Sequence, residues 1–369
     1  MVKNDDTYYM KKALQLAKKG EGKVSPNPLV GAVVVKNNEI VGRGYHKKAG
    51  TPHAEVHALE QAGEMSAGAT LYVNLEPCCH IGKTPACSLK IINSNIKRLV
   101  VAMEDPNPLV AGKGFKQLKE SGIEVKSGVL KKEAKKLNEI FIKNMKEKSP
   151  FIYLKTAQTL DGYLATSTGD ARWVTNKKAR EYGHKLRHKV DGILVGIGTV
   201  LSDNPRLTTR IEGKEGIDPI RIVLDSNLRT PLNANIINQQ SDSKTMIFTS
   251  QDHDKNKFKE FKKKDNVQVI ILSKDNNGRL DLHAMVKILF DMEVMSILIE
   301  GGGTINHSFL KQELVDKVYT FIAPKILGGD DGIPAFKGSG IKKMKDIYKL
   351  KNIEYEHLND NLLIKGEIN

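Results

Sequence analysis

Four residues in the first quarter of the chain have the types and the order that hydrolytic metal chemistry needs. His53, Cys78 and Cys87 offer one imidazole and two thiols, and a catalytic zinc takes three such protein ligands while its fourth position stays open to water. Glu55 follows His53 by two residues, at the expected start of a helix. Its carboxylate can therefore reach that water without binding the metal, which predicts a general acid and base.

The spacing of these residues nearly matches a known signature. Zinc nucleobase deaminases carry H-x-E followed by P-C-x-x-C, and this chain has HAE at 53–55 and PC at 77–78. Position 81 is Ile81, however, and the next thiol beyond Cys79 is Cys87. Adjacent side chains of an extended segment point to opposite faces, so Cys79 is not expected to bind the same zinc as its neighbour, and we assign it no role.

Each part of this pattern has an ordinary alternative when it stands alone. A His-Ala-Glu triplet on a helix usually has no catalytic role, and paired cysteines often pack as small apolar side chains. His46, His57 and His80 are also metal candidates by residue type, but each fits a polar surface position equally well. The ordered combination favours zinc.

The chain is long enough for two domains. It has 369 residues, of which 40% are hydrophobic and 27% charged, as is ordinary for folded proteins. A charged amphipathic helix is expected over about 131–148, and Ser149-Pro150 ends it because proline cannot continue a helix. We therefore expect domains over 1–148 and 149–369.

Hydrophobic patterns predict an α/β architecture in both domains. In the first, an amphipathic helix over 5–19 precedes a hairpin with an Asn37-Asn38 turn and a helix that ends near Gly63. Strands and helices then alternate. In the second, apolar runs separated in several places by helical segments predict a largely parallel sheet. These runs are FIYLKTA, GILVGIG, IRIVLD, TMIFTS, VQVIIL, SILIEGG and VYTFIAP.

A run of glycines marks a candidate phosphate site in the second domain. Gly301, Gly302 and Gly303 lie between a strand and an expected helix, where main-chain N–H groups and the positive helix end can bind phosphate. Steric demands of the turn would also select glycine. No G-x-G-x-x-G follows the first strand, so an ordinary Rossmann site is not expected. Glu300 would be costly to bury without a partner, which favours a polar site or a ligand there.

Charge and cysteine content restrict location and partners. The net charge of +15 comes from lysines spread along the chain, which favours solvated helix faces and encounter with a phosphorylated small molecule over a nucleic-acid surface. The three cysteines lie between 78 and 87, which argues against a disulfide framework. The N-terminal residues lack a signal-peptide pattern, and the apolar runs are too short to span a bilayer. We expect a cytoplasmic protein that binds neither membrane nor nucleic acid.

The first domain resembles the deaminase part of the bifunctional riboflavin-biosynthesis deaminase/reductase. The stretches that carry this resemblance are PNPLVGAVVV, GYH, HAEVHAL, EPCCHIGKTPAC and DPNPLVAGKG, within about residues 8–115. It implies a cytidine-deaminase-like α/β/α domain with one zinc ion per chain. It also implies that zinc hydroxide deaminates 2,5-diamino-6-(ribosylamino)pyrimidin-4-one 5'-phosphate while Glu55 moves the protons. The residues implied to contact that substrate are Asn27, His46, His80 and Lys83.

The second domain resembles the reductase part of the same family. KTAQTLDGYLATSTGDARWVT, GILVGIGTVLSDNPRLTTR, RIVLDS, IEGGG and FIAPKILGG carry the resemblance, whereas about 231–294 matches only in α/β character. It implies a dihydrofolate-reductase-like α/β domain that uses NADPH to reduce the ribosyl group of 5-amino-6-(5-phosphoribosylamino)uracil to ribityl. The residues implied to contact NADPH are Ala157, Trp173, Thr199, Asp203, Ser226, Gly302, Gly303, Thr304, Ile305, Asn306, His307 and Ser308. Those implied to face the substrate are Ala171, Arg187, Leu207, Arg210 and Glu300.

For some of these residues, the chemistry of the side chain by itself also suggests a role. Arg187 and Arg210 could clamp a phosphate, because a guanidinium donates two parallel hydrogen bonds to it. Lys155 and Asp203 are candidates for proton transfer near the ribose. Trp173 could instead have a packing role, and Asp203 could serve the turn before the following proline.

Two other classes of protein are alternatives. A nucleic-acid-editing zinc deaminase with a C-terminal binding module would share the HAE motif and the positive charge, but the cysteine spacing and the lack of aromatics along a basic stripe disfavour it. A zinc-stabilised structural protein would use four protein ligands, and only three are well placed. The bifunctional enzyme, expected to be a homo-oligomer by its resemblance, is the preferred hypothesis.

Overall fold

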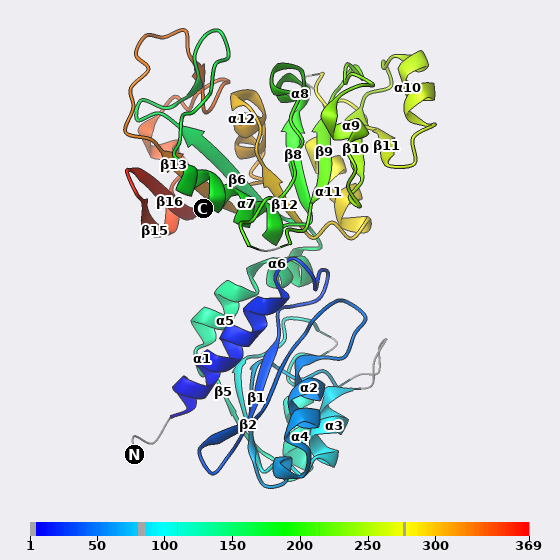
Figure 1. The fold of residues 1–369 in the computed structure, drawn as a ribbon, viewed down its shortest axis with the longest axis vertical. Coiled ribbons are helices and arrows are strands. Elements are labelled where there is room, and N and C mark those ends of the chain that lie inside the picture. Colours follow the sequence, from blue (N-terminus) through cyan, green and yellow to red (C-terminus); the bar gives the residue numbers. More distant parts are fainter. Residues whose placement is uncertain (1–4, 80–85, 109, 214, 276–277, 369) are drawn as a thin grey trace. The chain divides into compact units, whose positions relative to one another are not determined.

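The protein consists of two compact units, Met1–Lys148 and Ser149–Asn369 (Figure 1). This computed structural model describes residues 5–79, 86–108, 110–213, 215–275 and 278–368. Each unit encloses its own buried apolar core. Every helix within the described residues is too short or too polar to cross a lipid bilayer.

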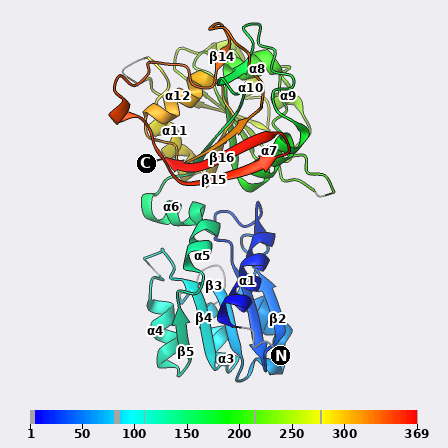
Figure 2. The ribbon, with the colours of Figure 1, turned by 90° about the vertical axis from the view of Figure 1, so that its left-hand side faces the viewer.

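The first unit is a five-stranded sheet between two layers of helices. Its elements are α1 (Asp6–Ala17), η1 (Lys18–Gly20), β1 (Gly31–Lys36), β2 (Glu39–Tyr45), α2 (Ala54–Ala62), η2 (Gly63–Ser66), β3 (Thr70–Leu75), α3 (Cys87–Asn93), β4 (Arg98–Met103), α4 (Lys113–Glu120), β5 (Glu124–Ser127), α5 (Lys131–Leu137) and α6 (Glu139–Glu147). The strand order is β2-β1-β3-β4-β5. Helices α1 and α5 lie on one face, and α2, α3 and α4 on the other (Figures 1 and 2). The predicted α/β/α layer architecture of this unit is confirmed.

The hairpin of the first unit forms where the sequence predicts it. Asn37 and Asn38 connect β1 to β2 with φ values of 53° and 65°. Asparagine tolerates this left-handed region better than most residues, and a two-residue hairpin turn needs it at both positions. Strand β1 also pairs antiparallel with β3, which places the hairpin beside the strand that leads to Cys78.

The prediction of a single helix over 131–148 is wrong. The structure has two helices there, α5 and α6, and the chain bends between them at Asn138. Asn138 is 2% exposed. Its Oδ1 accepts from the main-chain N–H of Leu29 at 2.8 Å, and its Nδ2 donates to the Leu29 carbonyl at 3.1 Å. An asparagine side chain that forms hydrogen bonds with the main chain of a distant segment in this way favours a break in the helix.

The second unit is built on a nine-stranded sheet. Its elements are β6 (Phe151–Gln158), β7 (Tyr163–Ala165), α7 (Lys177–Lys189), β8 (Gly192–Gly196), α8 (Ile197–Asp203), β9 (Ile220–Leu224), α9 (Asn235–Asn238), β10 (Thr245–Thr249), α10 (Lys255–Phe261), β11 (Val267–Ile271), α11 (Leu282–Asp291), β12 (Ser296–Ile299), α12 (Gly303–Lys311), β13 (Lys317–Ile322), β14 (Ile333–Pro334), η3 (Met344–Asp346), β15 (Leu350–Leu358) and β16 (Asn361–Ile368). The sheet order is β11-β10-β9-β8-β12-β6-β13-β16-β15. From β11 to β13 all neighbours are parallel, as predicted.

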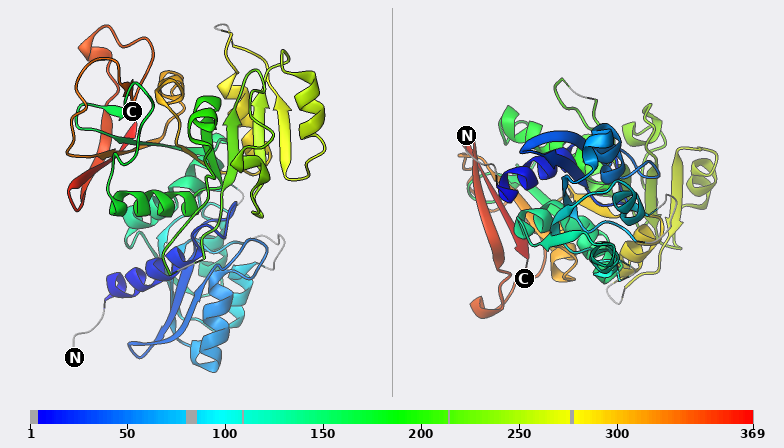
Figure 3. Two further views of the ribbon diagram at one scale, coloured as in Figure 1. Left: turned by 45° about the horizontal axis from the view of Figure 1, so that its top comes forward. Right: turned by 90° about the horizontal axis from the view of Figure 1, so that it is seen from below.

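Alternate residues of the parallel strands face two separate cores. Leu194 of β8 packs in the core that includes α11 and α12, while its neighbours Ile193 and Val195 pack in the core that includes α8, α9 and α10. The yellow-green to yellow strands of this half lie side by side in Figure 3. Because a strand turns successive side chains to opposite faces, helices on both faces require the nearly continuous apolar runs seen in the sequence.

The C-terminal hairpin was not foreseen from the sequence. Strands β15 and β16 pair antiparallel and extend the sheet through β13 (red arrows in Figure 2). Polar residues, among them Lys351, Glu354 and Glu356, occur throughout β15, and most of that strand is exposed. It therefore lacks the apolar run that identified the central strands. The pair β7 and β14 was missed because its strands, of three and two residues, are too short to show a periodic pattern.

The Asn138 contact yields a stability prediction. Replacing Asn138 with Ala leaves the partly buried N–H of Leu29 without this acceptor, and we expect a loss of about 1 to 3 kcal/mol in the free energy of unfolding of the first unit. Chemical denaturation followed by hydrogen exchange of residues 27–36 measures it. Asn93→Ala, at an exposed position at the end of α3, is the matched control. Equal stability of the two variants would contradict this account.

Candidate metal centre and reductase site

The end of β2 and the start of α2 position His53 and Glu55. His53 is the N-cap residue of α2, with extended backbone, and Glu55 lies in the first turn. The helix can approach β2 this closely because position 44 is glycine. A Cβ atom on Gly44 would meet the carbonyl oxygen of Ala54 at 2.1 Å, well inside van der Waals contact. The GYH stretch thus provides the space in which the HAE motif lies.

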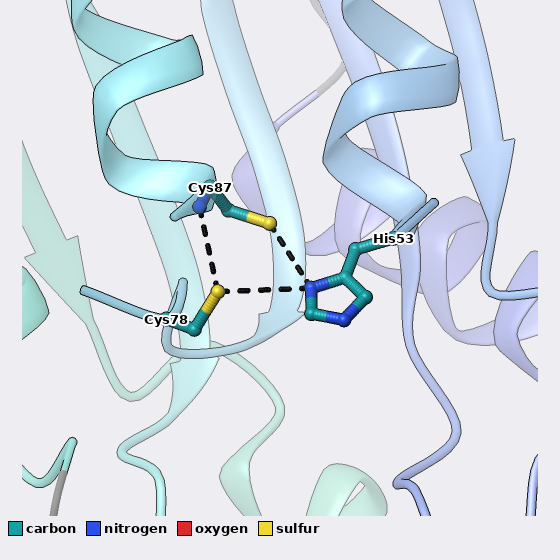
Figure 4. A group of neighbouring side chains, drawn as sticks. All are labelled: His53, Cys78 and Cys87. Atoms are coloured by element: carbon teal, nitrogen blue, oxygen red, sulfur yellow. Dashed lines mark hydrogen bonds between the residues drawn. The ribbon is translucent and has the colours of Figure 1, made fainter. Parts of the chain in front are cut away.

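Three elements bring the ligand candidates together (Figure 4). His53 comes from the start of α2, Cys78 from the segment after β3, and Cys87 from the first residue of α3. Their ligand atoms all lie within 4.8 Å of one another. His53 Nδ1 is 3.1 Å from Cys87 Sγ and 3.7 Å from Cys78 Sγ. One nitrogen and two sulfurs around a common centre form a donor set that suits zinc with one coordination position left open.

The local electrostatics also suit a metal with a proton carrier beside it. The neighbouring Cys87 thiol lowers the pKa of Cys78 well below its usual range, which favours the thiolate that metals bind. Glu55 is 3% exposed, and burial raises its pKa to about 7. Among the residues that the structure describes, none forms a hydrogen bond with its buried Oε2. A buried carboxyl group with an unused oxygen beside a set of metal ligands fits a residue that exchanges protons with a molecule at the metal.

Asn27 and His46 lie beside this centre. Nδ1 of His46 faces the Pro52 carbonyl at 3.3 Å, so this nitrogen carries the proton and Nε2 accepts from Asn27 Nδ2 at 3.1 Å. The ring of His46 meets that of His53 edge-on, with centroids 5.3 Å apart. The structure thus brings two of the four proposed substrate contacts to the metal ligands. The other two, His80 and Lys83, lie outside the described residues.

Two buried side chains that the sequence analysis missed hold the surrounding loops. Asn74 Oδ1 accepts from Gly31 N–H at 2.7 Å, and its Nδ2 donates to Leu29 O at 2.8 Å. Both carboxylate oxygens of Glu76 accept main-chain N–H groups from the segment that follows β4. In the sequence, Asn74 and Glu76 stand out only by their position at the end of a strand, just before the PC motif. That position does not show whether a polar side chain is buried and bonded to the main chain or exposed to water.

The proposed reductase residues gather where the parallel strands end. Ala157 lies near the end of β6, Thr199 and Asp203 on α8 after β8, Ser226 after β9, and Glu300 after β12. Since these strands are parallel, their carboxyl ends meet at one edge of the sheet, where open α/β sheets bind ligands. Ser226 is held there through its carbonyl oxygen, which accepts from Ser250 N–H at 3.0 Å.

Glu300 has a partner within the protein, so the ligand invoked to explain its burial is not needed. Arg187 donates through Nε to Glu300 Oε1 at 2.9 Å and through Nη2 to Oε2 at 3.0 Å. Lys155 Nζ lies 3.6 Å from the same carboxylate. The Arg187 guanidinium, which the sequence analysis expects to bind a phosphate, therefore donates its paired hydrogen bonds to Glu300 instead. These two charges hold the pKa of Glu300 at about 2 despite its burial.

The remaining residues differ in what they offer a ligand. Trp173 is 65% exposed, so a packing role in the core is excluded and a packing role at the surface stays possible. The guanidinium carbon of Arg180 lies 4.2 Å from the centre of its ring, and Lys325 Nζ donates to its carbonyl at 2.6 Å. Ala171 is exposed. Leu207 is 5% exposed and has a φ of 56°. Asp203 is exposed and accepts from Ser202 Oγ at 2.7 Å.

The glycine-rich segment forms the strand-to-helix turn that the sequence predicts. Gly302 is the N-cap residue of α12 and Gly303 is its first residue. A Cβ on Gly303 would meet the Pro334 carbonyl at 2.3 Å, so close packing requires glycine there. Asn306 is fully buried and donates to the Ala335 carbonyl at 2.9 Å. Thr304 is exposed, and Ile305, His307 and Ser308 are partly buried.

Fold and site together define a two-site α/β enzyme in which a zinc-type deaminase unit precedes a reductase unit. Residues 3–103 match the family described as "Cytidine and deoxycytidylate deaminase zinc-binding region", and residues 150–364 match "RibD C-terminal domain". The chain belongs to the RibD family, the bifunctional deaminase/reductase enzymes of riboflavin biosynthesis.

Relatives and solved structures match along the whole chain. Riboflavin biosynthesis protein RibD of Aquifex aeolicus is 46% identical and aligns over 99% of both chains. That of Actinobacillus pleuropneumoniae is 42% identical over 97% of this chain and 94% of its own. RibD of Acinetobacter baumannii has a TM-score of 0.87 at 34% identity, and the deaminase/reductase of Thermotoga maritima one of 0.85 at 37%, each with 99% coverage of both chains. The nucleic-acid-editing alternative is not favoured, because the similarity continues through the second unit.

The Arg187–Glu300 pair generates a second prediction. Glu300→Gln removes one partner of a buried pair and leaves the Arg187 charge uncompensated, which we expect to lower the free energy of unfolding of the second unit by about 3 kcal/mol. Denaturant unfolding followed by hydrogen exchange in β12 measures this change. Glu313→Gln, at an exposed position just after α12, should have little effect. A loss as small as that of the control would show that the pair adds nothing to stability.

Proposed function

We propose that the first unit deaminates 2,5-diamino-6-(ribosylamino)pyrimidin-4-one 5'-phosphate and that the second reduces the ribosyl group of 5-amino-6-(5-phosphoribosylamino)uracil with NADPH. The observation that carries the deaminase half is the convergence of His53, Cys78 and Cys87 within 4.8 Å beside a buried glutamate. The Thermotoga maritima structure, 37% identical over nearly the whole chain, is described as having both activities. Both substrates carry a phosphate, which suits the net charge of +15.

In this proposal His53, Cys78 and Cys87 hold one zinc ion per chain. Zinc, when bound, lowers the pKa of a water molecule toward neutrality and so supplies the nucleophile at neutral pH. Three protein ligands leave the fourth position free, as catalytic sites require. Cys79 has no part in the cluster.

Glu55 is the proton carrier of the proposed deamination. Its unpartnered Oε2 accepts the proton from water and then delivers protons to the pyrimidine ring nitrogen and to the departing ammonia. A pKa raised to about 7 lets the carboxyl group change protonation state at neutral pH. Asn27 and His46 contact the pyrimidine substrate, together with His80 and Lys83.

In the second unit the strand ends and the start of α12 form the NADPH and substrate sites. NADPH, when bound, supplies the hydride that reduces C1' of the ribosyl group. Main-chain N–H groups at the start of α12 suit the cofactor phosphates. Ala157, Trp173, Thr199, Asp203 and Ser226 contact the remainder. Lys155 and Asp203 handle the proton near the ribose. Ala171, Arg187, Leu207, Arg210 and Glu300 line the substrate side. The protein works as a cytoplasmic homo-oligomer and uses neither nucleic acid nor membrane.

Glu55→Gln tests the deaminase mechanism. The amide cannot carry the proton, so ammonia release should fall by at least about 100-fold, while zinc content stays the same. NADPH oxidation on supplied deaminated substrate should be intact and serves as the internal control. Ammonia release at the wild-type rate would exclude Glu55 from the mechanism.

Cysteine substitutions test the ligand set. We expect Cys87→Ser to lose the zinc, which metal analysis of the purified protein measures, because a serine hydroxyl is a far poorer zinc ligand than a thiolate. Cys79→Ser is the matched control and should retain one zinc per chain. The reverse result would move the site from Cys87 to Cys79.

A further inference from the structure

Trp173 follows an exposed turn of the second unit. The residue itself is 65% exposed. Local hydrogen bonds close the turn before it: Thr166 N–H donates to the carbonyl of Asp170 at 3.1 Å, and Arg172 N–H donates to the Asp170 carboxylate at 3.0 Å. Such short-range bonds shape a turn but do not attach it to the sheet. An indole on a surface segment of this kind samples many orientations unless other residues hold it.

Two cations from different segments hold this tryptophan. The guanidinium carbon of Arg180, on α7, lies 4.2 Å from the centre of the indole ring, which is a cation–π contact that restricts the ring. Arg180 is itself held, because its Nη1 donates to the Thr175 carbonyl at 2.7 Å. Lys325 Nζ donates to the main-chain carbonyl of Trp173 at 2.6 Å. This second contact ties the segment that carries Trp173 to the segment after β13.

The main chain around Lys325 is attached to the segment that follows β6. The Lys325 carbonyl accepts from Leu160 N–H at 2.8 Å. The Asp161 carboxylate accepts from the N–H groups of Leu327 and Gly328 at 3.0 and 2.8 Å, and an ionised acceptor makes such bonds stronger than neutral ones. Because these bonds fix the main chain at and just after position 325, the lysine side chain extends from a fixed point and can hold Trp173 in one position.

These contacts lie at the sheet edge where the cofactor site is proposed. Strands β6 and β13 are parallel neighbours, with Phe321 of β13 opposite Ala157 of β6. The segments that follow them, which carry Leu160 and Lys325, therefore leave the sheet at its carboxyl edge, where open α/β sheets bind ligands. Ala157 and Trp173 are both among the proposed NADPH contacts. The lysine thus holds one proposed cofactor contact beside another.

We propose that Lys325 is a positioning residue of the reductase unit, which orients Trp173 for NADPH by holding its main-chain carbonyl. With Arg180 against the ring and Lys325 at the main chain, the indole is ordered before the cofactor arrives, so binding does not carry the entropic cost of ordering it. Lys325 in this way increases the affinity for NADPH without touching it. The inference rests on the proposed function, since it takes NADPH to bind against Trp173.

Trp173 is the only tryptophan of the chain, so tryptophan fluorescence reports on this one site. In the ligand-free, full-length protein, time-resolved anisotropy should show a larger amplitude of fast local motion in Lys325→Met, which keeps the side-chain length but has no donor. Lys325→Arg can donate to the same carbonyl and should restore the wild-type amplitude. Lys349→Met, at an exposed position just before β15, is the matched control. Equal amplitudes in Lys325→Met and this control would overturn the proposal.

Cofactor binding is measured on the same variants. The reduced nicotinamide absorbs tryptophan emission, so quenching of Trp173 during an NADPH titration gives the Kd. We expect Lys325→Met to raise this Kd by about 3- to 10-fold, as the loss of one hydrogen bond implies, and Lys325→Arg to restore it. KM for NADPH should rise by the same factor, while KM for the uracil substrate and the deaminase activity stay unchanged.

The two measurements distinguish failure of this inference from failure of the proposed function. If wild type binds NADPH but Lys325→Met has an unchanged Kd, the inference is wrong and the proposed cofactor stands. If wild type does not bind NADPH at all, the proposed reductase function is wrong, and the role of Lys325 in NADPH binding is wrong with it. In that case the anisotropy of the ligand-free protein still shows whether Lys325 holds Trp173.

Discussion

The metal centre depends on one geometric constraint, that three donor atoms from separate segments meet within a few ångströms. His53 begins one helix, Cys87 begins another and Cys78 follows a central strand, so the sheet and two helices must align before the donor set exists. Buried polar groups around it, such as Asn74 and Glu76, bond the main chain of neighbouring loops. Without a bound cation the site brings two thiols and a carboxyl group together at a cost in free energy, so its surroundings have to be rigid.

In the second unit, a buried ion pair holds separate segments in place. Glu300 and Arg187 are both largely buried, and each makes the burial of the other tolerable through two parallel hydrogen bonds. Arg187 also reaches Thr208, so the ion pair links the end of β12 to the segment that carries Leu207 and Arg210. An interaction that could be taken for ligand binding is here a part of the scaffold that orients the ligand site.

Sequence patterns predicted the strands that carry apolar runs and the first hairpin with its Asn37-Asn38 turn, and missed the C-terminal hairpin, which has neither signal. The central strands and the HAE and PC motifs were recognisable because burial on two faces and metal ligation each restrict residue type at fixed positions. The C-terminal hairpin carries lysine and glutamate on an exposed strand, so its pattern is weak. The break at Asn138 and the pairing of Glu300 with Arg187 arise from contacts more than 100 residues apart in the chain, and local sequence holds no signal for either.

Separate cores in the two units have a consequence for how such a chain evolves. Leu194 and its neighbours pack among residues of the second unit alone, and the apolar core beneath α1 belongs wholly to the first. The side chains that fill each core therefore have to complement only neighbours within their own unit, so the core of each half can change in sequence without matching changes in the core of the other. Translation of one message still yields both halves in equal numbers, which keeps the capacities of two successive steps matched without separate control of their synthesis.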